Sequence, residues 1–322
     1  MENQWSLIFV LALLTGGSVF CQEANYGPGY QTIMIDNPAV AGSRVEGTLR
    51  LSYLNFYPGH HYNFHSVFLS CDSYFPVLHG GAGFYITDDY TGGIMNDLRS
   101  GLSYSYFLQA GKKLFINAGL SASLFHRGFN FADAILPDQI DAMGGISIPS
   151  SEVLMNANRT VLDVGTGFIA IYGRFIGGFA VNHLAQPDLA GNGSSSDKLR
   201  RKYLLHFTAD FDLNSNINLK IRPLVTLMLQ GDYFSGYAGA LLEANSLAIN
   251  SGLAVSNNKN IDIQAGFSFR KERLAIFYSY RFNVSSENSL MPFSLIHQTG
   301  LALGLNNVKK RIKVRTINMP EL

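Results

Sequence analysis

The sequence predicts an all-β fold, namely a transmembrane antiparallel β-barrel of about 14 strands with both termini in the periplasm. Three observations lead to this prediction. Segments of about ten residues alternate between apolar and polar positions. Short and long connections between these segments alternate along the chain. A leader typical of exported proteins is followed by no apolar run of membrane-helix length.

The alternation is clearest in the segments 260–270 and 273–283, where side chains two residues apart share one face. The polar face carries mainly Ser, Thr, Gly, Asn and Gln, which suits an enclosed lumen. A soluble β-sandwich or solenoid is the less favoured alternative, because its exposed face is normally rich in Lys and Glu. The residues predicted to face lipid are Ile261, Ile263, Phe267, Phe269, Leu274, Ile276, Tyr278 and Tyr280.

The number of predicted strands is even, as bacterial single-chain barrels require. The strands are predicted at 45–56, 61–74, 80–88, 98–110, 114–125, 161–172, 174–184, 203–213, 217–230, 232–242, 246–256, 260–270, 273–283 and 294–305. Connections after even-numbered strands are short, whereas the long ones, 127–160 and 185–201 among them, follow odd-numbered strands. In an up-and-down barrel these two classes lie at opposite ends, with short turns in the periplasm and long loops outside.

The N-terminal residues 1–21 are typical of a secretory signal peptide, with an apolar run from Leu7 to Leu14 followed by small residues. Cleavage after Cys21 is predicted without lipidation, because the bulky Phe20 directly precedes the cysteine. Only Cys71 then remains, so no intramolecular disulfide is expected. The net charge of +1 gives no reason to expect a nucleic-acid partner.

No reactive site is predicted from the sequence: no catalytic residue, no cofactor and no metal. Adjacent His60 and His61 would point to opposite sides of a strand, and Asp88 and Asp89 lack the ligand spacing of a calcium loop. A degraded enzyme barrel would still need a nucleophile and a base close together, and no such motif is visible. The chain is therefore predicted not to be an enzyme.

The charged residues of the polar faces are expected to neutralise one another inside the barrel, so the lumen is predicted to be filled rather than a wide pore. Within one strand, Pro223 removes a ladder hydrogen bond and predicts a bulge. The residues predicted to form the lumenal charge set are Glu46, Arg50, His206, Asp210, Asp212, Lys220, Arg222, Asp262, Arg270 and Arg281.

An ordered set of short motifs carries a family resemblance. "NPAVAG", Asn37–Gly42, is followed by "SVFLSCDSYFPVLHGGAGFYITDDYTGG", "LRSGLSYSYFLQAGKKLFINAGLSASL", "GGFAVNHLAQPD", "LAIFYSYRFN" and "SLIHQTGLALGL". This set resembles the PorP/SprF family, membrane components of the type IX secretion system of Bacteroidota, over about residues 30–305. Arg281 and Gln298 stand where the family pattern has Asp and Glu, which favours a divergent paralogue over the core secretion component.

The resemblance implies a non-enzymatic outer-membrane barrel that assists export or surface anchoring of secreted, adhesin-type substrates, a role linked to gliding motility. The implied partners are outer-membrane lipid, the C-terminal domain of a substrate at the outer loops, and a periplasmic secretion-system or peptidoglycan-binding protein. A general porin or transporter is the alternative function.

The chain divides into a signal peptide (1–21), an N-terminal periplasmic or plug segment (22–44), the barrel (45–305) and a basic periplasmic tail (306–322). The proline bend and the small residues of "NPAVAG" would let it pass closely along the barrel base or inside it. The residues predicted to bind a partner are Asn37, Pro38, Ala39, Gly42, Lys309, Lys310, Arg311, Lys313 and Arg315.

Overall fold

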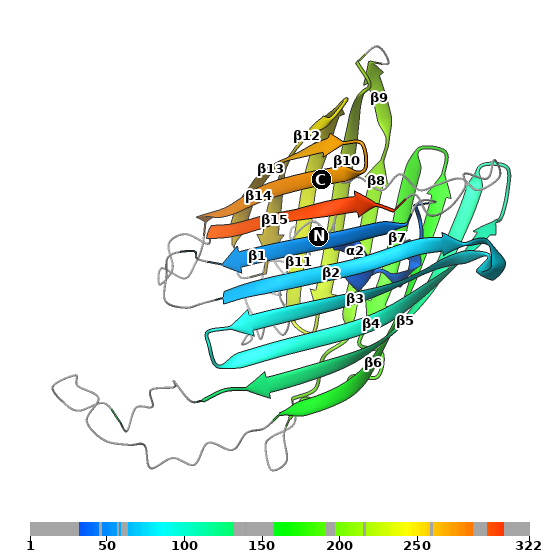
Figure 1. The fold of residues 1–322 in the computed structure, drawn as a ribbon. Helices are drawn as coiled ribbons and strands as arrows, with labels where there is room; N and C mark the ends of the chain where they lie inside the picture. The colour runs from blue at the N-terminus through cyan, green and yellow to red at the C-terminus, as the bar shows by residue number, and fades with distance from the viewer. Residues whose placement is uncertain are drawn as a thin grey trace, which may run out of the picture.

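The computed structural model is a closed antiparallel β-barrel (Figure 1). Each strand pairs with its neighbours in sequence, and β1 pairs with β15 to close the ring. Of the fifteen strand segments, β8 and β9 form one strand interrupted at Asp210, and both pair with β10, so the barrel has fourteen strands. The predicted antiparallel barrel of about 14 strands is confirmed, and the placement of both termini in the periplasm stays a prediction.

The structure describes residues 32–44, 47–56, 58, 64–131, 139, 158–190, 197–214, 217–257, 260–285 and 295–305. The strands are β1 (Thr48–Phe56), β2 (Phe64–Phe75), β3 (Gly80–Thr91), β4 (Met95–Gln109), β5 (Leu114–Phe129), β6 (Arg159–Tyr172), β7 (Phe175–Asn182), β8 (Lys202–Ala209), β9 (Phe211–Asn214), β10 (Leu219–Gln230), β11 (Tyr233–Ala244), β12 (Leu247–Ser256), β13 (Ile261–Lys271), β14 (Leu274–Ser285) and β15 (Leu295–Gly304). Among the described residues, no helix is long and apolar enough to cross a bilayer.

The connections fall into two groups at opposite ends of the barrel. One end, the short-turn end, carries 76–79, 110–113, 173–174, 215–218, 245–246 and 272–273. The other end, the long-loop end, carries 57–63, 92–94, 130–158, 183–201, 231–232, 257–260 and 286–294. The predicted separation of short and long connections is therefore confirmed.

The alternation in the sequence corresponds to the inner and outer faces of the barrel wall. Phe267 and Ile276, predicted to face lipid, are each 53% exposed, while Ser268 between two outward residues is buried. Ile261, Phe269 and Leu274 are also exposed, and the remaining predicted lipid-facing residues, Ile263, Tyr278 and Tyr280, are half-buried on the same outward face.

The sequence predicts a bulge at Pro223, but the structure has none at this position. Register against β9 shifts between Leu219 and Lys220, and Pro223 keeps its place in the ladder opposite Ala240 of β11. On its other side the neighbouring strand is interrupted between β8 and β9. Since proline has no N–H to donate, the irregularity falls on the partner strand rather than on β10 itself.

Candidate functional site: a plug in the barrel lumen

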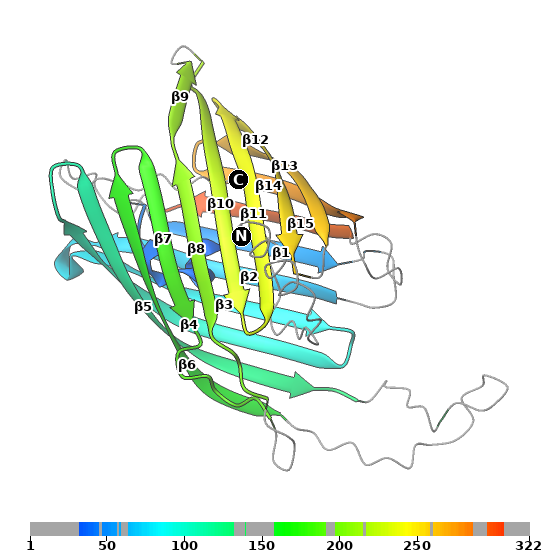
Figure 2. The same cartoon turned by 180° about the vertical axis from the view of Figure 1, so that it is seen from behind.

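Residues 32–43, here called the plug, lie inside the barrel. Seen from one side they lie behind β2 and β3, and seen from the other they lie behind β7 and β8 (Figures 1 and 2). The plug contains the short helix α2 (Ile33–Asp36) and the 3-10 turn η1 (Pro38–Val40). Ala39 and Ala41 are 0% exposed, so this part of the chain is enclosed by the barrel wall.

The "NPAVAG" motif forms the turn by local chemistry. Asn37 is extended, and its Oδ1 accepts a hydrogen bond from the Ala39 N–H at 3.0 Å, which caps η1. Pro38 occupies the first position of the turn, where the missing N–H removes no hydrogen bond. Gly42 has φ +63°, a left-handed conformation that glycine adopts at little cost.

Glycines of the wall let the plug backbone approach closely. A Cβ on Gly119 of β5 would lie 2.2 Å from the Ala39 nitrogen, and a Cβ on Gly167 of β6 would lie 2.1 Å from Asn37 Oδ1. A Cβ on Gly81 of β3 would likewise lie 2.0 Å from the Ala41 oxygen. These three inward glycines form a seat into which no larger residue fits without moving the plug.

Apolar side chains hold the plug on two sides. Met34, Ile35 and Ala41 share a buried cluster with the inward residues Leu54, Phe68, Tyr85 and Ile296. Ala39 and Val40 pack with Ile169, Ile171 and Ile176 of β6 and β7. The barrel wall thus carries two inward apolar patches that match the apolar residues of the plug, and burying them stabilises the seated position.

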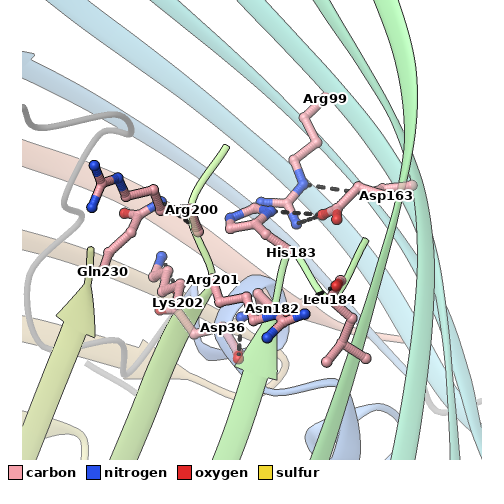
Figure 3. A network of polar contacts seen from close by, with 11 residues as sticks. Asp36, Arg99, Asp163, Asn182, His183, Leu184, Arg200, Arg201, Lys202 and Gln230 are labelled. Atoms are coloured by element: carbon pink, nitrogen blue, oxygen red, sulfur yellow. Dashed lines mark hydrogen bonds and ion pairs between the residues drawn. The ribbon is translucent and has the colours of Figure 1, made fainter. Parts of the chain in front are cut away.

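Polar contacts fix the turn between α2 and η1. Asp36 Oδ1 lies 2.8 Å from the Lys202 Nζ, and the Asp36 carbonyl accepts a hydrogen bond from Asn182 Nδ2 at 2.8 Å (Figure 3). Asn37 Nδ2 lies 3.0 Å from His206 Nε2. The Ala39 carbonyl accepts a hydrogen bond from Ser105 Oγ at 2.9 Å. The contacts therefore join the plug to both strands that flank the connection 183–201.

A second polar cluster lies above the plug, toward the long-loop end. Asp163 Oδ2 lies 2.7 Å from His183 Nδ1 and accepts a hydrogen bond from Arg99 at 3.3 Å (Figure 3). Arg127 donates to both carboxylate oxygens of Asp97 at 2.7 Å and to Asp197 at 2.8 Å. Because Asp197 belongs to the connection 183–201, the last contact ties that connection to the barrel wall.

The predicted lumenal charges are found mostly where expected. Arg50, His206, Arg222 and Arg281 are buried, and Asp210, Asp262 and Arg270 are half-buried on inward faces. The prediction for Asp212 is wrong, because its side chain is 74% exposed and lies 3.8 Å from half-buried Lys220 at the rim. The reason is that β9 pairs with β10 alone and projects beyond β7 (Figure 1). Glu46 lies outside the described residues.

The residues predicted to bind a partner have two different placements. Asn37, Pro38, Ala39 and Gly42 lie in the plug and contact the barrel wall, so their binding to a partner stays a prediction. The basic residues of the tail, Lys309, Lys310, Arg311, Lys313 and Arg315, lie outside the described residues.

The sequence analysis missed the glycine seat, the Asp36–Lys202 pair and the cluster around Asp163. A signal for them was present, since Gly119, Gly167, Asp163 and Lys202 all occupy inward positions of the alternation. Alternation gives the face of a residue but not its partner across the lumen. Within the described chain, no group of three or more His, Cys, Asp or Glu side chains is arranged to hold a metal ion.

Comparisons with solved structures show the fold. The toluene transporter TodX of P. putida is 12% identical, with a TM-score of 0.52, over 86% of this chain and 94% of its own. A FadL homologue of Pseudomonas aeruginosa is 12% identical over 90% and 96%, with a TM-score of 0.48. Omp33, an outer membrane protein of Acinetobacter baumannii, is 8% identical over 82% and 99%, with a TM-score of 0.47.

The family comparison is more specific. No curated protein matches the chain. The family model described as type IX secretion system membrane protein PorP/SprF matches residues 19–294, which include the plug and all but the last strand. Family and fold together are those of a secretion-system barrel of the outer membrane. This chain belongs to the PorP/SprF family of type IX secretion system membrane proteins.

Proposed function

We propose that this barrel is a non-conducting anchor of the type IX secretion system that assists export or surface attachment of a secreted, adhesin-type substrate. In this proposal the C-terminal domain of the substrate binds the loops of the long-loop end. A periplasmic secretion-system or peptidoglycan-binding partner binds at the short-turn end. No catalytic step is part of the proposal.

The observation that carries this proposal is the plug. Residues 32–43 occupy the lumen on a seat of glycines, between apolar patches and under a buried ion cluster. Because the plug occupies part of the lumen, the proposal assigns function to the two ends of the barrel. The long connections, 130–158 and 183–201 above all, provide the surface for a substrate, since binding residues are concentrated on loops held by a rigid scaffold.

The proposed orientation places the short-turn end and both termini in the periplasm, as in other outer-membrane barrels. Trypsin added to intact cells should cut within 183–201, where Arg200 and Arg201 are exposed, and should leave a tag after Leu322 intact. Lysed cells serve as the control in which the tag is also removed. A tag that trypsin removes from intact cells would show that the orientation is reversed.

The basic tail is proposed to dock on an acidic periplasmic surface and so tie the barrel to its partner. In this proposal the plug also contributes to partner binding. It keeps the N-terminal segment at the barrel that carries the tail, through Asn37, Pro38, Ala39 and Gly42. Attraction between the tail and an acidic surface is long-ranged and should weaken with salt.

Truncation after Asn307 tests the role of the tail. The barrel should still insert, because β15 ends at Gly304. Periplasmic proteins should no longer co-purify from native outer membrane, and surface display of the substrate should fall several-fold. A matched variant, with Lys309, Lys310, Arg311, Lys313 and Arg315 all replaced by Gln, should behave like the truncation if charge is the cause. Unchanged display and co-purification in both variants would remove the tail from the proposed function.

A diffusion channel is the second candidate, favoured by one observation: the similar barrel TodX is a toluene transporter by its description. The two functions differ in planar bilayers. A plugged anchor should give no stepwise ion conductance, whereas a diffusion porin should conduct and should not retain substrate or periplasmic proteins through purification.

A further inference from the structure

The long connection between β7 and β8 folds back on the inner wall of the barrel. Its described parts, 183–190 and 197–201, are here called the strap. Leu189 and Leu199, one from each arm of the strap, are 3% and 0% exposed and share a buried cluster with the inward residue Phe125 of β5. The strap therefore lies on the wall at the long-loop end instead of standing free in solvent.

Hydrogen bonds join the two arms of the strap into one unit. The Leu189 N–H donates to the Asp197 carbonyl, and the Leu199 N–H donates to the Pro187 carbonyl, both at 2.9 Å. Asp188 Oδ1 accepts a further hydrogen bond from the Asp197 N–H at 2.9 Å. Because the arms are bonded in this way, a displacement of one arm moves the other.

A charged contact and a residue in a costly conformation mark where the strap is held. Arg127 of β5 donates to Asp197 at 2.8 Å. At the base of the strap, His183 has φ +57°, a left-handed conformation that is unfavourable for a residue other than glycine. Contact between His183 Nδ1 and Asp163 Oδ2 at 2.7 Å offsets this strain. Release of the strap would therefore allow the backbone at His183 to change conformation.

Both ends of the strap meet a single residue of the plug. Asn182, the last residue of β7, donates from Nδ2 to the Asp36 carbonyl at 2.8 Å (Figure 3). Lys202, the first residue of β8, places its Nζ 2.8 Å from Asp36 Oδ1. Asn182 and Lys202 also pair with each other across the two strands. Since His183 directly follows Asn182, a conformational change at His183 displaces the peptide group next to the residue that holds the plug.

We propose that the strap is a relay between the long-loop end and the plug. A ligand that lifts the strap from the wall loosens the seated plug, because the movement withdraws Asn182 and Lys202 from Asp36. Coupling of this kind acts equally in both directions, so an unseated plug also loosens the strap. The use of the relay rests on the proposed function, in which the ligand is a protein domain of the substrate, whereas the coupling itself is a property of the barrel alone.

The rate of thiol labelling reports the position of the plug. Val40 of the plug is 4% exposed, so Val40→Cys introduces a thiol that is covered while the plug is seated. Cys71→Ser removes the other thiol of the chain from Gln22 onward. This parent chain is refolded in a zwitterionic detergent, and the rate at which a maleimide modifies the introduced thiol measures how often the plug leaves its seat.

Leu199→Ala is expected to raise the labelling rate about tenfold or more, because it removes buried contacts that hold the strap on the wall. Leu184→Ala is the matched control: it makes the same change in the same strap, at a side chain that is 38% exposed. Its labelling rate should equal that of the parent. Asp197→Asn weakens the contact with Arg127 and should raise the rate in the same direction, which keeps the test open if Leu199→Ala folds poorly.

A double-mutant cycle separates a relay from general loosening of the barrel. Asn182→Ala combined with Lys202→Gln removes both side-chain contacts to Asp36 and should itself speed labelling. In that background Leu199→Ala should add less than about threefold, since the connection from the strap to the plug is already broken. A full tenfold addition in that background would show that the strap does not act through these two residues.

The reverse direction is tested with the wall glycines. Gly119→Val, which makes a Cβ collide with the plug, should speed trypsin cleavage after the exposed Arg200 and Arg201 of the strap. Gly177→Val, on the outward face of β7, should leave this cleavage unchanged. The heat-dependent gel mobility of folded barrels checks that each variant folds.

Equal labelling rates in Leu199→Ala and Leu184→Ala, or unchanged strap cleavage in Gly119→Val, would overturn the relay. No substrate is present in these measurements, so their failure would leave the secretion role standing. Conversely, a barrel that shows the coupling but retains no substrate during purification would contradict the proposed function and not the relay.

Discussion

Gly119→Val is expected to destabilise the barrel by about 1–3 kcal/mol or more and to unseat the plug. The physical reason is a backbone collision: a Cβ at this position would lie 2.2 Å from the Ala39 nitrogen and 2.5 Å from the Ala39 Cα. Neither atom belongs to a flexible side chain, so the plug must leave its seat or the strand must bend. The plug would then lose its apolar contacts with Ile169, Ile171 and Ile176.

Two measurements check this prediction. The free energy of unfolding is obtained from guanidinium titration of the refolded barrel, with the folded fraction followed by gel mobility. Seating of the plug is followed by trypsin cleavage after Arg44, which should be slow in the unmodified barrel and fast in the variant.

Gly177→Val is the matched control on the neighbouring part of the wall. Gly177 faces outward on β7, and a Cβ there would lie 3.9 Å from a Phe207 ring carbon, an ordinary contact. The control should keep the stability and the slow cleavage of the unmodified barrel. If both variants behave alike, the inward glycines are not needed for the plug.

Phe267→Arg is expected to cost about 2–4 kcal/mol, because the side chain lies near the middle of β13 and faces the hydrocarbon core. The charged group must then leave water for lipid or pull water into the bilayer. The measurement is the free energy of unfolding in phospholipid bilayers, obtained from denaturant titration.

Ile261→Arg is the depth control for this prediction. Ile261 faces outward like Phe267 but is the first residue of β13, so arginine there should cost only about 0–1 kcal/mol. Equal costs at both positions would contradict the lipid-facing assignment of this strand. Ser268 is unsuited to be the control, since it is buried and an arginine there would also be crowded.

Most of the fold could be predicted because it depends on local patterns. Side chains of a strand alternate faces, so residues such as Phe267 and Ser268 reveal their sides without any knowledge of neighbouring strands. Up-and-down topology then fixes the pairing, and connection length separates the two ends. The prediction failed where a neighbouring strand decides whether a side chain is covered. Asp212 is exposed because β9 projects beyond β7.

The candidate site was predicted only in part. The proline bend and small residues of "NPAVAG" left two paths open, along the barrel base or inside it, and the structure places Asn37–Gly42 inside. The inward glycines that receive the motif, Gly119 and Gly167, are ordinary strand glycines in the sequence. Their role becomes visible only when the plug backbone is found against them.

The sequence by itself determined the strands, their faces and the two ends, because these follow from alternation and spacing over a few residues. Its ordered motifs, from "NPAVAG" onward, carried the resemblance to the family. Only the tertiary structure decided which inward groups meet. Asn37 contacts His206 across 169 residues of chain, and Asn182 donates to Asp36 across 146. Such contacts depend on how the closed barrel staggers its strands around the plug, and no local pattern encodes that stagger.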